Sequence, residues 1–371
     1  MLTYNNALVS DIQRLIDYTP MPSRVDGRTV SIRTINSFFH SLIISLEISK
    51  ERLNPNQPNY NEVYHANLSK LYKYVVEECN DEDMDTLKDI AAQPIDWDYI
   101  LIDEAQDFED IEKDVLFKIY GPNRIIVADG VDQFMRTGVR QNWDHKIASK
   151  QLYKPRPMTL ERRQKANLVR FVNAFAKLSG LDWSVEPNNE LLGGQVQIYT
   201  RYNTDIHINL KKNCSENECE NYDILILEPP TMIEKDDRGY SHFKNCSKYE
   251  QNGISLFDGT NASNRTTYPT KDQCRLYQYD SCRGLEGWCV VCDKFDELYQ
   301  YKINTFVDNN NALGLDRDII KKRNVLLWML MPLTRPIDTL VITLTNPNSE
   351  IGRMLHDLSQ QYEDFIEWNI K

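Results

Sequence analysis

Tyr99-Ile100-Leu101-Ile102-Asp103-Glu104-Ala105-Gln106-Asp107-Phe108 is the stretch of this sequence from which the fold can be predicted. Its first four residues form an apolar run with strand character, and the run ends in two adjacent carboxylates. Ligands of open α/β sheets bind at the carboxyl ends of parallel strands, so we expect Asp103 and Glu104 to face a site. One carboxylate can hold Mg²⁺ while the next orients a water for attack on a phosphoryl group. For an isolated acid pair, the alternative is a surface turn after a buried strand.

The composition is that of an ordinary globular protein large enough for two domains, with 371 residues, 41% hydrophobic and 26% charged. No apolar run reaches the length of a membrane span, and the N-terminus lacks the pattern of a signal peptide. The eight cysteines form no dense disulfide framework, so we expect a cytoplasmic protein with no membrane partner. The net charge of −12 argues against broad nucleic-acid binding by bulk electrostatics, so any DNA contact must come from a local groove.

A second strand-like run begins at Arg124 and ends in the polar sequence Ala128-Asp129-Gly130-Val131-Asp132-Gln133. The two stretches resemble motif II, the Walker B segment, and motif III of superfamily 1 helicases of the UvrD type. In motif III, alanine here replaces the first glycine of the family pattern Gly-Asp-x-x-Gln. The resemblance implies that Asp103 coordinates Mg²⁺, that Glu104 polarises the attacking water, and that Gln133 senses the γ-phosphate.

Two stretches near the N-terminus, residues 1–8 and 34–39, resemble motifs Ia and Ib of the same family. Hydroxyl and amide side chains suit contacts with phosphate and sugar, which position DNA without reading its sequence. The resemblance implies that single-stranded DNA is contacted by Thr3, Asn5, Thr34 and Ser37. The alternative for Thr34 and Ser37 is a helix N-cap. Trp143, downstream of motif III, is a candidate for an aromatic ring that stacks on bases.

Lys154-Pro155-Arg156-Pro157 predicts a linker, because two prolines in four residues exclude regular structure. Beyond it, three further stretches resemble motifs IV, V and VI, in family order. They lie at residues 160–165, 277–291 and 325–335. The resemblance implies that Arg163 and Arg335 neutralise charge at the γ-phosphate and that Glu286 binds the nucleotide ribose. Gly284 permits close approach of the backbone to that ligand.

The motifs together predict an α/β protein with two RecA-like lobes, each with a parallel sheet flanked by helices. We expect the first lobe at residues 1–154, with a helical insertion at 40–94, and the second at 155–371. The expected function is that of an ATP-dependent DNA helicase or translocase, with ATP and Mg²⁺ as cofactors and single-stranded DNA as partner.

One motif of the family is missing. No glycine in the sequence is followed by lysine, so the P-loop Gly-x-x-x-x-Gly-Lys-Ser/Thr, which cradles the β- and γ-phosphates, is absent. We therefore expect the first lobe to be incomplete at its N-terminus and the isolated chain to be inactive. An upstream segment or a separate chain would supply the P-loop. We also expect its strand to lie beside Tyr99–Ile102, which would be left unpaired on that side.

Two other functions compete with a truncated or split helicase. A degenerate, non-hydrolysing module could bind DNA or a partner protein, but Glu104, Gln133, Arg163 and Arg335 are all retained. A nuclease could use the acid pair with a metal, but no further acidic ligands cluster at a nuclease spacing. Cysteines and histidines between residues 207 and 246 invite a zinc site, although their spacing matches no common zinc module.

Overall fold

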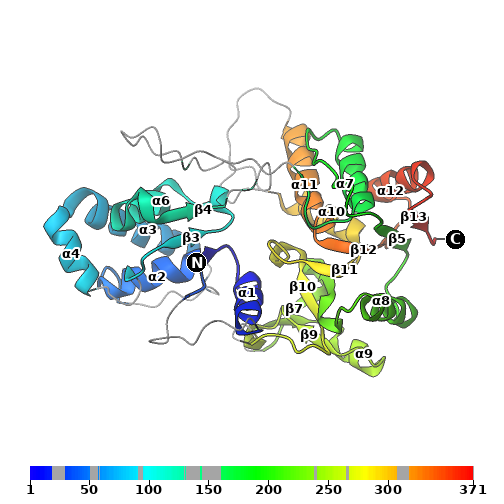
Figure 1. Ribbon diagram of the computed structural model, residues 1–371, viewed down its shortest axis with the longest axis horizontal. Helices are drawn as coiled ribbons and strands as arrows, with labels where there is room; N and C mark the ends of the chain where they lie inside the picture. Colours follow the sequence, from blue (N-terminus) through cyan, green and yellow to red (C-terminus); the bar gives the residue numbers. More distant parts are fainter. Residues whose placement is uncertain are drawn as a thin grey trace. The chain divides into compact units, whose positions relative to one another are not determined.

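The structure is a computed structural model (Figure 1), and it describes residues 1–18, 30–50, 57, 59–90, 95–128, 130, 143, 160–237, 240–264, 267–306 and 317–370. The described residues divide into two compact units. Unit 1 holds those up to residue 143, and unit 2 holds those from residue 160 onward.

The described strands of unit 1 form one four-stranded parallel sheet. Its order is β2-β1-β3-β4, with bounds Arg33–Thr34, Leu2–Thr3, Ile100–Ile102 and Ile125–Val127. The prediction that Tyr99–Ile102 lacks a neighbouring strand on one side is therefore wrong. The strand β3 pairs with β1 on one side and with β4 on the other. Leu2 lies level with Ile102, and its carbonyl accepts a hydrogen bond from the Asp103 amide at 3.0 Å. Strand order depends on long-range pairing, which a local apolar pattern does not encode.

Helices pack around this sheet through an apolar core. Their bounds are α1 Asn6–Tyr18, α2 Ile35–Ser45, α3 Tyr60–Tyr72, α4 Asp81–Ile90 and α6 Asp110–Tyr120, with the π-helical turn η1 Lys73–Glu78 and the 3₁₀ turns η2 Ala105–Asp107 and η3 Pro122–Arg124. Residues of the segment predicted as a helical insertion enter this core: Leu68, Leu71 and Val75 are fully buried. The capping box of α6, formed by Glu109 and Glu112, fixes where that helix begins.

The larger sheet of unit 2 has seven described strands, all parallel. Its order is β13-β5-β12-β11-β6-β10-β9, with bounds Ile366–Trp368, Gln195–Tyr199, Pro336–Thr343, Gly287–Cys292, Ile224–Glu228, Cys274–Gln278 and Leu256–Asp258. A separate antiparallel hairpin joins β7 (Ile233–Lys235) and β8 (Ser241–Phe243). The central strands are almost wholly apolar because both faces of a parallel sheet are covered.

Helices cover the two faces of this sheet (Figure 1). The helices α7 and α8 lie on opposite faces, with α10, α11 and α12 on the side of α7. Their bounds are α7 Ala166–Leu178, α8 Thr204–Glu216, α9 Cys246–Gln251, α10 Phe295–Thr305, α11 Arg317–Leu333 and α12 Glu350–Gln361, with the 3₁₀ turns η4 Asn221–Asp223, η5 Pro230–Met232, η6 Ala262–Asn264 and η7 Tyr279–Ser281.

The described parts of the chain are thus mixed α/β, with two parallel sheets flanked by helices, and the predicted fold class is confirmed at this level. The two apolar runs that the sequence predicts as strands, at residues 99–102 and from residue 124, correspond to β3 and β4, whereas β7, β8, β9, β10 and β13 were not predicted. None of the described helices is both long enough and apolar enough to span a membrane.

Candidate functional site

The acid pair lies where the sequence predicted it, directly after β3 and at the carboxyl edge of the unit 1 sheet. Glu104 adopts a left-handed backbone conformation, with φ 54° and ψ 45°. Few residues other than glycine adopt it, and those that do concentrate at functional sites. This turn ends the strand and starts the 3₁₀ turn η2, so Asp103 and Glu104 project at the strand end while Ala105 is buried.

Gln106 ties the acid pair to the end of β4. Its Nε2 donates to Glu104 Oε2 at 2.6 Å, and its Oε1 accepts from the Gly130 amide at 2.7 Å. A Cβ on Gly130 would lie 2.7 Å from Gln106 Nε2, so a larger residue here would force the Gln106 side chain to shift. The Ala105 amide also donates to the Ala128 carbonyl at 3.0 Å. These hydrogen bonds join the segment after β3 to the end of β4. Gln133, the predicted γ-phosphate sensor, lies outside the described residues.

Trp143 is a core residue, and its prediction as a base-stacking ring is wrong. It is only 4% exposed, its Nε1 donates to the Ala105 carbonyl at 2.7 Å, and its ring packs edge-on against Phe108 at 5.3 Å. It therefore supports the motif II turn from beneath. A lone aromatic in a polar sequence does not show which of these two roles it has.

The four predicted DNA-contacting residues all lie at the carboxyl ends of β1 and β2, which are neighbours in the sheet. Thr3 is fully buried and its hydroxyl has no hydrogen-bond partner in the described part of the chain, so it would have to become accessible to contact DNA. Asn5 and Thr34 cap the helices that follow: the amides of Leu8 and Ser37 donate to them at 2.8 and 3.2 Å. The N-cap alternative for Thr34 is thus confirmed. Ser37 is exposed on the first turn of α2.

Unit 2 brings its predicted site residues together at the amino ends of β11 and β12. Arg163 donates from Nη2 to the Thr334 carbonyl at 2.7 Å, and its Nη1 lies 3.5 Å from Glu286 Oε2. Glu286 is exposed, and Gly284 has a φ of 76°, which glycine adopts without strain. Residues from three separated motifs therefore share one edge of the sheet.

Arg335 belongs to the same edge but is only 3% exposed. Its Nε donates to the Met331 carbonyl at 3.0 Å, Nη1 to the Leu285 carbonyl at 3.4 Å, and Nη2 to the Thr334 hydroxyl at 2.8 Å. In this structure the guanidinium joins the end of α11 to the loop before β11.

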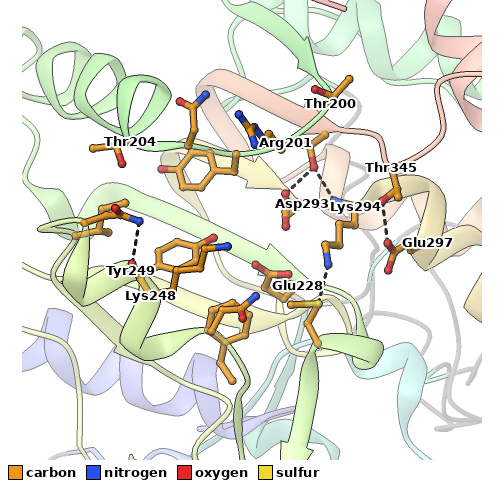
Figure 2. A pocket seen from close by; sticks show the side chains of 18 residues that line it. Thr200, Arg201, Thr204, Glu228, Lys248, Tyr249, Asp293, Lys294, Glu297 and Thr345 are labelled. Carbon is orange, nitrogen blue, oxygen red and sulfur yellow. Dashed lines mark hydrogen bonds between the residues drawn. The ribbon is translucent and has the colours of Figure 1, made fainter.

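A second site, which the sequence analysis missed, lies at the opposite edge of the same sheet. A pocket of about 390 Å³ is formed at the carboxyl ends of β5, β12, β11 and β6 (Figure 2). Its floor holds Glu228, the last residue of β6, and Asp293, which follows β11. Each acid ends an apolar strand, as Asp103 does, but neither has a second acid directly beside it in sequence, which is the signal that marked Asp103 and Glu104.

The two acids are adjacent because their strands are hydrogen-bonded neighbours, with Cys292 level with Leu227. Glu228 is 1% exposed, and its Oε2 accepts no hydrogen bond within the described part of the chain. Burial, and then the neighbouring carboxyl of Asp293, raise the pKa of Glu228 well above its ordinary value. Burial also raises the pKa of Asp293, although the Thr343 hydroxyl donates to it at 2.6 Å and opposes the shift.

No metal site is apparent in the described ranges, where no group of three or more histidine, cysteine or acidic side chains could hold an ion. The zinc possibility raised by the cysteines finds no support there. Asp103 can supply one carboxylate to Mg²⁺, and further ligands would have to come from a bound nucleotide or water, as is usual for this ion. Comparison of the sequence with models of protein families and with curated proteins finds no match.

Proposed function

We propose that this chain is the motor part of a UvrD-type superfamily 1 DNA helicase or translocase, which hydrolyses ATP with Mg²⁺ and moves along single-stranded DNA. Under this proposal the two units are RecA-like lobes. The observation that carries it is the acid pair after β3. Glu104 is held by Gln106, which is itself fixed by the backbone after β4.

The chemistry of the acid pair supports phosphoryl transfer. A carboxylate at the end of a parallel strand can ligate Mg²⁺, and the next can orient the attacking water, so Asp103 and Glu104 take these roles. The hydrogen bond from Gln106 to Oε2 of Glu104 orients this carboxylate. Positioned groups of this kind account for much of the catalysis in NTPases.

The proposal assigns the cationic group of this reaction to Arg163 of unit 2. Arg163 has one nitrogen on a backbone carbonyl and another beside Glu286, and its side chain is 31% exposed, so it can still turn toward a phosphate. Gly284 and Glu286 on the same edge suit backbone and ribose contacts with ATP. DNA contacts fall to the carboxyl ends of β1 and β2, through Thr34 and Ser37.

The given sequence contains no P-loop, and under this proposal β4 offers a place for the strand that would carry it. Among the described strands β4 pairs only with β3, and Ile126 at its middle is 56% exposed. Edge strands with exposed apolar residues readily accept another strand. We therefore place the P-loop strand beside β4, and not beside β3 as the sequence suggested.

A degenerate, non-hydrolysing module that binds DNA or a protein is the second candidate function. It is favoured by Arg335, which is buried and donates to protein groups, and by the missing Gly-Lys pair. The two functions differ in whether ATP is hydrolysed once a P-loop is present.

The test is to express the chain together with the reading frame directly upstream and to measure ATP hydrolysis with and without single-stranded DNA. DNA-stimulated hydrolysis that requires the upstream segment supports the motor. A stable complex that carries a Gly-x-x-x-x-Gly-Lys-Ser/Thr sequence and binds ATP, yet never hydrolyses it, supports the degenerate module.

A further inference from the structure

The pocket at the carboxyl edge of the unit 2 sheet lies at a point where the chain reverses its direction across the sheet. The strands β9 and β10 lie on one side of β6, and β11 and β12 lie on the other. Open α/β sheets bind ligands in the crevice at such a point. The pocket volume of about 390 Å³ falls within the range of small-molecule sites, about 300–1,000 Å³.

The floor of the pocket presents an unsatisfied hydrogen-bonding group. Figure 2 shows the Glu228 carboxyl between Tyr249 on one side and Asp293 with Lys294 on the other. Tyr249 interacts with the Glu228 carboxyl and opposes the rise in its pKa that burial causes, but Oε2 has no hydrogen-bond partner among the described residues. An unpaired oxygen is costly in a buried position unless a ligand or a water supplies its partner. A neutral carboxyl offers one donor and one acceptor side by side, which matches the donor and acceptor pair on the edge of a nucleobase.

One wall of the pocket is aromatic and held in place. The rings of Tyr202 and Tyr249 stack with centroids 6.2 Å apart, and Phe243 packs edge-on against Tyr249 at 5.5 Å. The Tyr202 hydroxyl lies 2.7 Å from Nδ1 of His207, whose pKa burial and Lys211 lower to about 4. A neutral histidine can accept this hydrogen bond and fix the ring. Aromatic walls of this kind stack on any base, because every base has a π-face.

Three cationic side chains, Arg201, Lys248 and Lys294, line the pocket beside the acidic Glu297. Arg201 and Lys248 are exposed lining residues, and Lys294 extends its ammonium to the thioether of Met232 at 2.8 Å. A thioether is a weak acceptor, so this ammonium remains available to a stronger one. A ligand with a polar planar group at one end and an anion at the other fits this arrangement.

We propose that this pocket binds a nucleotide, with its base against Tyr249 and hydrogen-bonded to Glu228, and with its phosphate at Arg201 and Lys248. The base can belong to a free nucleotide or to a nucleic-acid strand, since the recognised chemistry is the same. The site lies at the opposite edge of the sheet from Arg163, so it is separate from the ATP site proposed above and does not depend on it.

The test is calorimetric titration of the whole chain with AMP and with ribose 5-phosphate, which lacks the base. We expect AMP to bind at least roughly tenfold more tightly, as expected when one base stacks. Glu228→Leu removes the hydrogen bonds and should abolish this difference, whereas Glu228→Gln keeps a donor and an acceptor and should preserve it. Tyr249→Leu should weaken AMP binding and Tyr249→Phe should not. Thermal melting of each variant checks that it folds.

Equal binding of AMP and ribose 5-phosphate would overturn the proposal, because it would show an anion site only. Undiminished AMP binding by Glu228→Leu would also overturn it. Arg163→Ala provides the control for the proposed ATP site, and AMP binding to the pocket should persist in it. A pentanucleotide of deoxyadenosine that competes with AMP identifies a strand as the source of the base, and failure to compete identifies the free nucleotide.

Discussion

Glu228 and Asp293 make the stability of unit 2 depend on pH. Burial and the neighbouring Asp293 raise the pKa of Glu228 above its ordinary value of 4.5, so the folded protein keeps a proton that the unfolded chain has released. Stability from this group is full below the ordinary pKa and is lost as pH rises through the folded pKa. The slope is at most about 1.4 kcal/mol per pH unit for one group.

Glu228→Gln removes this titration. We expect the variant to be more stable than the wild type near neutral pH and to lose less stability between pH 5 and pH 8, roughly the window above the ordinary carboxyl pKa. Urea unfolding followed by circular dichroism at several pH values measures both effects. Since Asp293 also titrates with a raised pKa, some dependence should remain. An unchanged slope in Glu228→Gln would show that Glu228 is already ionised in the folded protein.

Trp143 tests whether the motif II turn is held by its core contacts. Trp143→Ala leaves a cavity beside Phe108 and should lower the free energy of unfolding by roughly 3–5 kcal/mol. Trp143→Phe keeps most of the packing, loses only the hydrogen bond to Ala105, and should cost less. Denaturant unfolding gives both values. If Trp143→Ala had the wild-type free energy of unfolding but a lower affinity for single-stranded DNA, Trp143 would have to be assigned to base stacking.

At the scale of elements, Arg163 and Arg335 both lie at the amino ends of β11 and β12. The sequence predicts the same role for both, but they differ in burial. Arg335 is buried on backbone carbonyls, so Arg335→Ala should cost at least about 1–3 kcal/mol of stability. Arg163 is partly exposed, and Arg163→Ala should cost about 1 kcal/mol of stability or less.

In a form that carries a P-loop, Arg163→Ala should lower turnover by about 10²–10³-fold with little change in ATP affinity. Equal losses of stability in the two variants would contradict this assignment.

The positions of β3 and β4 were predictable because each is a short apolar run ended by polar residues, whereas a strand such as β2 (Arg33–Thr34) carries no such pattern. The order in which the strands pair was not predictable. The strand β1 lies beside β3 through contacts between residues about 100 positions apart in sequence, such as the pairing of Leu2 with Ile102. The acid pair after β3 was found because two carboxylates stand together. Glu228 and Asp293 were missed because each stands alone in sequence and only the sheet makes them neighbours.

At the scale of the whole molecule, the net charge of −12 limits DNA binding. We expect weak, salt-sensitive binding to single strands, little binding to duplex, and a shallow salt slope of about −0.7 for each phosphate contacted. Ser37→Asp should weaken it further, because Ser37 is exposed at the predicted contact surface. Ser69→Asp, on another exposed helical serine of unit 1, is the matched control. Fluorescence anisotropy at several salt concentrations measures the affinity of each variant for single-stranded and duplex DNA. Tight binding to duplex at high salt would contradict the expectation of weak, salt-sensitive binding.

The most direct test of the proposed motor is the rate of ATP hydrolysis by Glu104→Gln in a form of the protein that carries a P-loop. Glutamine keeps the size of Glu104 but cannot take a proton from the attacking water. The proposal predicts that ATP still binds, while turnover on single-stranded DNA falls by about 10²–10⁴-fold. Hydrolysis by Glu104→Gln at the wild-type rate would contradict it.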